Sequence, residues 1–132
     1  MTVVVDASVV VAALVDNGRE GQWADDVLLS GPLAAPHLLP VETANVLRKA
    51  ALDGVISGDV ATLAHGDLGD VRLELFDYPP FAGRVWELRH NLSAYDAWYV
   101  ALAEALDAPL ATLDSRLAQA TGPRCAFLTR PA

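Results

Sequence analysis

Short apolar runs with the composition of β-strands alternate with segments of helical periodicity along the whole chain. The first run, 2–5, is β-branched, and it is soon followed by a second apolar segment, 8–15, with the length of a short helix. Parallel strands need a crossover connection, most often a helix, so this alternation favours a parallel sheet. We therefore predict an α/β fold, with a central parallel β-sheet flanked by α-helices on both faces.

Turn and capping signals set the boundaries of the predicted elements. Pro40 suits the first turn of a helix, and Ser93 with Asp96 resembles a capping box that opens the helix 94–106. The predicted strands are 2–5, 33–35, 71–76, 109–112 and 126–128. The predicted helices are 8–15, 19–29, 40 to the turn at 53–54, 57–68, 79–90, 94–106 and 115–120.

Length and hydrophobic content predict one domain, 1–132. The chain has 132 residues, of which 53% are hydrophobic, enough for one core and too few for a second module. The apolar stretch 3–15 is interrupted by Asp6 and is too short to span a bilayer, so we expect no membrane segment. Cys125 is the single cysteine and cannot form an intramolecular disulfide, so a cytoplasmic location is expected.

The charge balance is strongly acidic. There are 17 Asp and Glu residues against 9 Lys and Arg residues, which gives a formal net charge of −8. This excludes binding of nucleic acid through an extended basic face, because affinity for phosphates depends on lysine and arginine. Local binding of a nucleic acid as a substrate is still compatible with the composition.

Four acids lie in apolar sequence at positions that the predicted fold brings to one edge of the sheet. Asp6 follows the first strand and Asp114 follows the strand 109–112, so both emerge at the carboxyl edge, where ligands of parallel sheets bind. Glu42 and Asp96 lie in the first turns of two helices that can face the same edge. Each acid alone is also explained as a helix cap or by a favourable interaction with the helix dipole.

Carboxylates that converge in one small pocket repel one another unless a cation neutralises them. Hard divalent cations such as Mg²⁺ or Mn²⁺ prefer oxygen ligands, and they activate water and stabilise charge in phosphodiester hydrolysis. Ser8 and Thr112 each lie two residues from one of the acids, where a hydroxyl can hydrogen-bond a ligand carboxylate or simply a turn.

The chain resembles PIN-domain ribonucleases, specifically the VapC-type toxins of bacterial toxin–antitoxin pairs. Val3–Ser8 is similar to the opening strand motif of the family, and Val41–Leu47 is similar to its helical Glu motif. Tyr95–Glu104 resembles the helix that carries the third acid, and Ala111–Leu117 resembles the closing Thr-x-Asp segment. The four motifs together span essentially the whole chain.

This resemblance implies an endoribonuclease in which metal-activated water cleaves RNA and leaves a 5′-phosphate. It assigns the Mg²⁺ or Mn²⁺ ligands to Asp6, Glu42, Asp96 and Asp114, called the four acids below, with Ser8 and Thr112 as supports. The family often has a further acid soon after the Thr-x-Asp segment, whereas this chain has Ser115–Leu117, so the number of metal ions stays open.

The resemblance also implies partners. It suggests a homodimer and a cognate antitoxin that inserts a basic side chain toward the acids, which an acidic surface would favour. Arg116 and Arg89 are candidate RNA contacts, although a solvated role is the common one for arginine. Trp98 and Tyr99 follow Asp96, and we expect them to pack on the sheet, with base stacking as the alternative.

Two other classes of function share some of these sequence features. A catalytically silent module that holds a basic peptide in its acidic pocket is the main alternative to the ribonuclease. Phosphotransfer domains of the haloacid-dehalogenase and receiver types also begin with a strand that ends in Asp. They fit poorly, because Asp6 is not followed by a second Asp and the only lysine, Lys49, lies late in a helix.

Overall fold

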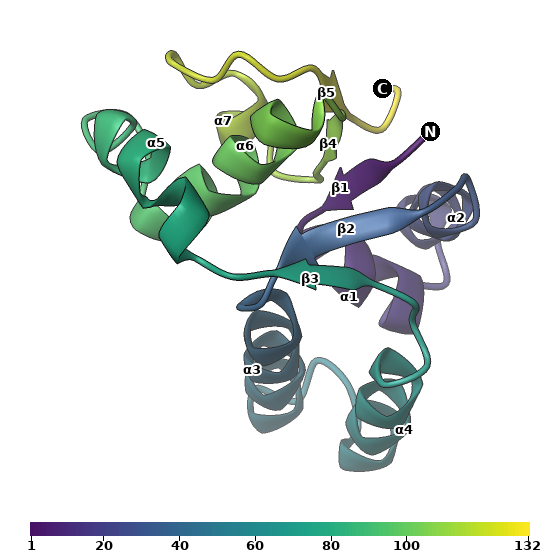
Figure 1. Cartoon of the computed structure of the whole chain (residues 1–132). Helices are drawn as coiled ribbons and strands as arrows, with labels where there is room; N and C mark the ends of the chain where they lie inside the picture. Colours follow the sequence, from purple (N-terminus) through teal and green to yellow (C-terminus); the bar gives the residue numbers. More distant parts are fainter.

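The sheet of this protein is wholly parallel. A computed structural model describes residues 1–132 and places five strands in the order β3-β2-β1-β4-β5 (Figure 1). The central strand β1 pairs with β2 through Val3 and Leu33 and with β4 through Val5 and Ala111. The strands are β1 (Val3–Val5), β2 (Leu33–Pro36), β3 (Glu74–Phe76), β4 (Leu110–Ala111) and β5 (Phe127–Leu128).

Helices cover both faces of the sheet, as the alternation of elements predicts. Helix α6 contacts β1, β2 and β4, whereas α1 contacts α2, α3 and α4, which together form the other layer (Figure 1). The helices are α1 (Ala7–Val15), α2 (Arg19–Leu28), α3 (Leu39–Leu52), α4 (Gly58–Leu68), α5 (Ala82–Glu87), α6 (Ala94–Leu106) and α7 (Ser115–Ala118), with a 3-10 turn η1 (Pro79–Phe81) before α5. None of these helices is both long and apolar enough to cross a membrane.

Several predicted elements are shorter in the structure, and the differences at the predicted strand 71–76 and the predicted helix 79–90 have clear local causes. Strand β3 begins at Glu74 and not at 71, because the N–H of Val71 closes a turn onto the carbonyl of Leu68 and is not free for a strand partner. The predicted helix 79–90 is divided into η1 and α5, and it ends at Glu87. Beyond this point the N–H groups form tight turns, such as that of Asn91 with the carbonyl of Leu88.

The core lies where β1 and α6 meet. The three residues of β1 are at most 1% exposed, and α6 contributes a continuous buried stretch from Tyr99 to Ala103. The two helices α1 and α2 pack closely at Gly21, where a Cβ atom would lie only 1.8 Å from the carbonyl oxygen of Asp16. This buried frame fixes the positions of the strand ends that carry the site.

Candidate active site

The four acids all lie at the carboxyl edge of the sheet. Asp6 directly follows β1 and caps α1, and Asp114 follows β4 closely and caps α7. Glu42 lies in the first turn of α3, and Asp96 lies in the first turn of α6, where its N–H donates to the Ser93 hydroxyl at 3.1 Å. Since β1 and β4 are neighbours in the sheet, the segments that follow them lie side by side.

Asp6 is buried, at 8% exposure, and both of its carboxylate oxygens accept hydrogen bonds. The Ser8 hydroxyl and the Val9 N–H donate to Oδ1, and the Thr112 hydroxyl donates to Oδ2. The Ser8 hydroxyl in turn accepts from the N–H of Leu113 at 3.0 Å. The Thr112 hydroxyl accepts from the N–H of Asp114, also at 3.0 Å. The two hydroxyls therefore join the ends of β1 and β4 and hold the Asp6 carboxylate in one orientation.

Glu42 has a partner that the sequence did not lead us to expect. The Tyr99 hydroxyl donates to Oε1 of Glu42 at 2.8 Å, from a side chain that is only 2% exposed. We predicted that Tyr99 packs on the sheet, and it belongs to the core as expected, but its hydroxyl also orients a site carboxylate. The spacing could have indicated this role, because Tyr99 lies three residues after Asp96 and so shares its face of α6.

Burial raises the pKa of three of the four acids, and the charges of neighbouring acids add to this effect at Glu42 and Asp96. The pKa of Asp6 is raised by burial, against the lowering effect of its hydrogen bonds from Ser8 and Thr112. The pKa of Glu42 is raised by burial and then by the charges of Asp96 and Asp6, despite the Tyr99 hydrogen bond. The pKa of Asp96 is raised by burial and by the charge of Asp114. The four acids therefore form one connected set of interacting negative charges.

The donor chemistry of the four acids suits a hard divalent cation, but their side chains are not yet arranged around one. No group of three or more His, Cys, Asp or Glu side chains in the structure is placed to hold a metal ion. No ion pair within 4.0 Å involves any of the four acids, so no cationic side chain contacts them directly. A cation would relieve the repulsion among the acids, and binding it requires the carboxylates to move closer together.

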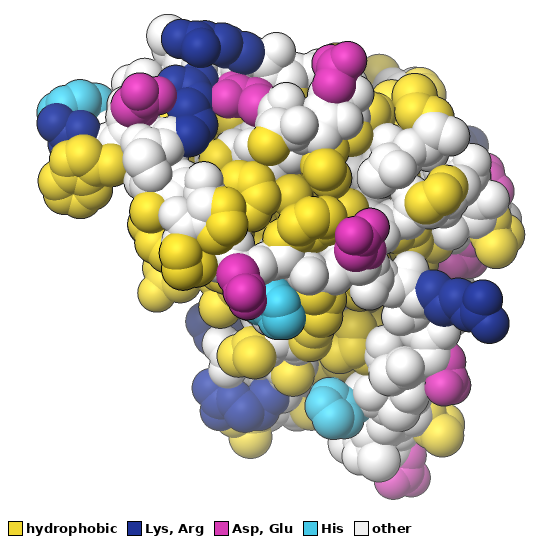
Figure 2. Space-filling model, in the orientation of Figure 1, with side chains coloured by type: hydrophobic (Ala, Val, Ile, Leu, Met, Phe, Trp, Pro, Cys, Tyr) yellow, Lys and Arg dark blue, Asp and Glu magenta, His cyan; other side chains and the backbone are white.

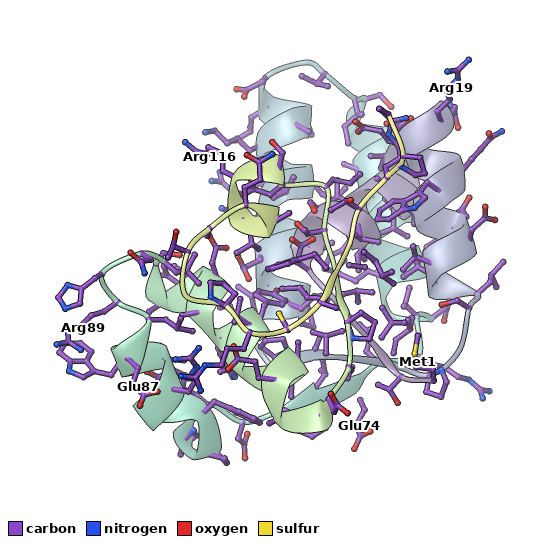
Figure 3. All side chains as sticks on the ribbon, turned by 90° about the horizontal axis from the view of Figure 1, so that it is seen from above. Met1, Arg19, Glu74, Glu87, Arg89 and Arg116 are labelled. Atoms are coloured by element: carbon purple, nitrogen blue, oxygen red, sulfur yellow. The ribbon has the colours of Figure 1, made fainter.

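The two candidate arginines occupy different places. Arg116 lies at the start of α7, where its N–H donates to Oδ1 of Asp114 at 3.0 Å, and its charge lowers the pKa of Asp96. Arg89 lies beyond α5, with its guanidinium 4.7 Å from the centre of the Trp86 ring, and in Figure 3 it is far from Arg116. The structure thus places Arg116 near the four acids and Arg89 away from them, in the segment that follows α5.

Trp98, like Tyr99, packs against the core. Its indole ring meets Tyr78 edge to face, with 5.2 Å between ring centres, and it lies among the partly buried side chains around the core. Base stacking by Trp98 would require this contact to open.

The chain is similar to known proteins over nearly its whole length. Residues 3–123 match the family described as PIN domain. Ribonuclease VapC1 of Mycobacterium tuberculosis is 43% identical, over 92% of each chain. Ribonuclease VapC9 of the same organism is 39% identical, over 98% of each chain. Among solved structures, the chain is similar to the crystal structure of VapBC2 from Rickettsia felis bound to a DNA fragment from their promoter. The TM-score is 0.69 at 15% identity, and the match covers 98% of each chain, which shows a shared fold.

Proposed function

The chain belongs to the PIN-domain family, and from this premise we propose that it is an endoribonuclease, the toxin of a toxin–antitoxin pair. Two relatives that share 43% and 39% of their residues with it are named as VapC ribonucleases. One structural observation carries the proposal. Four carboxylates at the starts of four separate helices lie at the carboxyl edge of the sheet, and three of them have raised pKa values.

In this proposal the four acids hold Mg²⁺ or Mn²⁺. When bound, such a cation lowers the pKa of a water molecule and stabilises negative charge on the leaving oxygen. The protein itself supplies orientation. Ser8 and Thr112 hold Asp6 through both of its oxygens, and the Tyr99 hydroxyl holds Glu42.

The proposed substrate is RNA, hydrolysed at a phosphodiester bond to leave a 5′-phosphate. Arg116 is placed to contact a phosphate, because its positive charge lies near Asp96 at the edge where the acids meet. Figure 2 shows the lysines and arginines of one face as small separate groups with no continuous basic surface. Binding of RNA is therefore expected to be local, and not tight and sequence-independent, while its cleavage is expected to depend on the metal ion.

The proposed partners are a cognate antitoxin and a second copy of the chain. The net charge of −8 would attract a basic segment of the antitoxin and speed its docking. Such a segment would neutralise the four acids in place of the cation. We expect the pair to act in the cytoplasm.

The test is cleavage of total RNA by the purified protein in Mg²⁺, in Mn²⁺ and in EDTA, with the new RNA ends mapped by sequencing. We expect cleavage in either metal, none in EDTA, and none by Asp96→Asn. Asp67→Asn is the matched control, because Asp67 is an exposed acid on α4 whose side chain makes no hydrogen bond or ion pair.

Cleavage that persists in EDTA would contradict metal dependence. No cleavage of a broad RNA panel in either metal, together with tight binding of a basic peptide that Asp96→Asn weakens, would favour the silent binding module instead.

A further inference from the structure

A cavity of about 450 Å³ opens beside the four acids, on the side of the sheet edge occupied by β5. Thr112 forms part of its wall, and the hydroxyl of the same residue donates to Asp6. Ser115, which follows Asp114 directly, forms another part. None of the four acids lines the cavity, so it adjoins the proposed site without belonging to it.

The rest of the wall comes from segments far apart in the sequence. Glu20 at the start of α2 lines it, and so do Thr129 and Arg130, which follow β5. In Figure 3 the yellow C-terminal segment extends toward the start of α2, where Arg19 is labelled. The size of the cavity lies in the range of small-molecule sites, about 300–1,000 Å³.

The wall combines hydrogen-bond donors and acceptors with an aromatic surface. Glu20 offers an acceptor, Arg130 offers donors, and the Gln119 amide offers both. Neither Glu20 nor Arg130 takes part in any of the ion pairs of the protein, so both charged groups are available to a ligand. Phe127 adds a flat apolar face.

This chemistry fits a neutral heterocycle better than an anion. Glu20 and Arg130 carry opposite charges, so the wall has no net positive charge to attract a bare phosphate, whereas a nucleobase presents donors and acceptors on its edge and a π-face for stacking. We propose that the cavity holds one unpaired nucleobase of the RNA, next to the phosphodiester that is cleaved. The inference rests on the proposed ribonuclease function and adds to it the element that selects the cleavage sequence.

The first test compares cleavage preferences in an RNA pool with randomised sequence. The wild type should prefer one base at a fixed distance from the cut. Gln119→Ala and Arg130→Ala should reduce that preference about fivefold or more and leave the preferences at other positions unchanged. Gln22→Ala is the matched control, because Gln22 is an exposed glutamine of α2 outside the cavity wall.

The second test measures binding without cleavage. Fluorescence anisotropy in EDTA compares a labelled RNA oligonucleotide that has the preferred base with one that is abasic at that position. The missing base should weaken binding about fivefold or more to the wild type and much less to Gln119→Ala.

The outcomes separate the two proposals. Cleavage with the same base preference in the wild type and both cavity variants overturns the cavity proposal and leaves the ribonuclease intact. An abasic RNA that binds the wild type as well as the intact one, or RNA that does not bind at all, overturns the cavity proposal as well. Base-dependent binding without cleavage in any metal overturns the ribonuclease and supports the cavity.

Discussion

Replacing Thr112 with valine should lower the free energy of unfolding by about 2–3 kcal/mol. The Thr112 side chain is 1% exposed, and its hydroxyl joins the ends of β1 and β4 by donating to Asp6 and accepting from the N–H of Asp114. Valine has nearly the same shape, so the packing around β4 is kept while both hydrogen bonds are lost.

The magnitude follows from the two hydrogen bonds and their burial. A hydrogen bond to a charged acceptor contributes about 1.5–3 kcal/mol, and a neutral one contributes about 1 kcal/mol. Because Asp6 is only 8% exposed, water cannot easily replace the lost donor. The methyl group that valine gains returns about 0.8 kcal/mol, since it is buried. The difference is the stated loss of about 2–3 kcal/mol.

The loss should depend on pH. The Thr112 hydrogen bond lowers the pKa of Asp6, which burial raises, so the variant carries an Asp6 with a still higher pKa. Above this pKa the carboxylate is charged and lacks its donor, and the full loss of stability is seen. As the pH falls through the Asp6 pKa of the variant and then of the wild type, Asp6 takes up a proton and depends less on the donor. The free energy of unfolding of the variant then approaches that of the wild type.

The assay is urea unfolding in EDTA at a series of pH values from 8 down to the ordinary Asp pKa of 3.8. Thr112→Ser is the matched control, because it keeps the hydroxyl and loses only a methyl group, which costs about 0.8 kcal/mol. If Thr112→Val were no less stable than Thr112→Ser, or if its loss were the same at every pH, the hydrogen bond to Asp6 would not be the stabilising interaction that we infer.

Two further predictions concern the site, and a third concerns an ion pair outside it. Tyr99→Phe should leave the fold intact, raise the pKa of Glu42 further and weaken Mn²⁺ binding measured by calorimetry; unchanged affinity would contradict the orienting role of the hydroxyl. Mn²⁺ at 100 times its Kd should stabilise the wild type by about 2.7 kcal/mol and raise its Tm, whereas Asp96→Asn should show no such shift. Burial raises the pKa of Glu104, but hydrogen bonds and charge from Arg84 and Arg124 together lower it more, so the net shift is downward. Arg84→Gln should therefore cost about 1–2 kcal/mol at pH 7, and urea titrations should show this difference shrink as the pH falls through the lowered pKa of Glu104, below the usual Glu value of 4.5. The hydrogen bond from Arg84 to the Gly122 carbonyl does not depend on Glu104, so a difference that stays unchanged in acid would contradict the contribution of Glu104.

Local patterns were enough to place most elements and all four acids. The β-branched run that ends at Asp6 becomes β1, and the capping signal at Ser93 opens α6 as predicted. The failures are also local in origin. The predicted helix 79–90 is divided, because apolar periodicity does not distinguish an α-helix from a series of tight turns over so short a segment.

The sequence predicted Ser8 and Thr112 as supports, but not which acid Thr112 reaches, nor the contact of Tyr99 with Glu42. Thr112 meets Asp6 across 106 positions of sequence, and Tyr99 meets Glu42 across 57. Periodicity shows which face of an element is buried, but it does not show which other element covers that face. The strand order, with β4 beside β1, decides that the Thr112 hydroxyl reaches Asp6.

The sequence alone was therefore sufficient for the fold class and for the common edge of the four acids, because these depend on local periodicity and on the geometry of parallel sheets. Only the folded chain decided that the Thr112 hydroxyl donates to Asp6 and the Tyr99 hydroxyl to Glu42, that Arg116 and not Arg89 lies near the acids, and that α2, α7 and the C-terminal segment line one cavity. Those features arise from packing between distant segments, which no local pattern records.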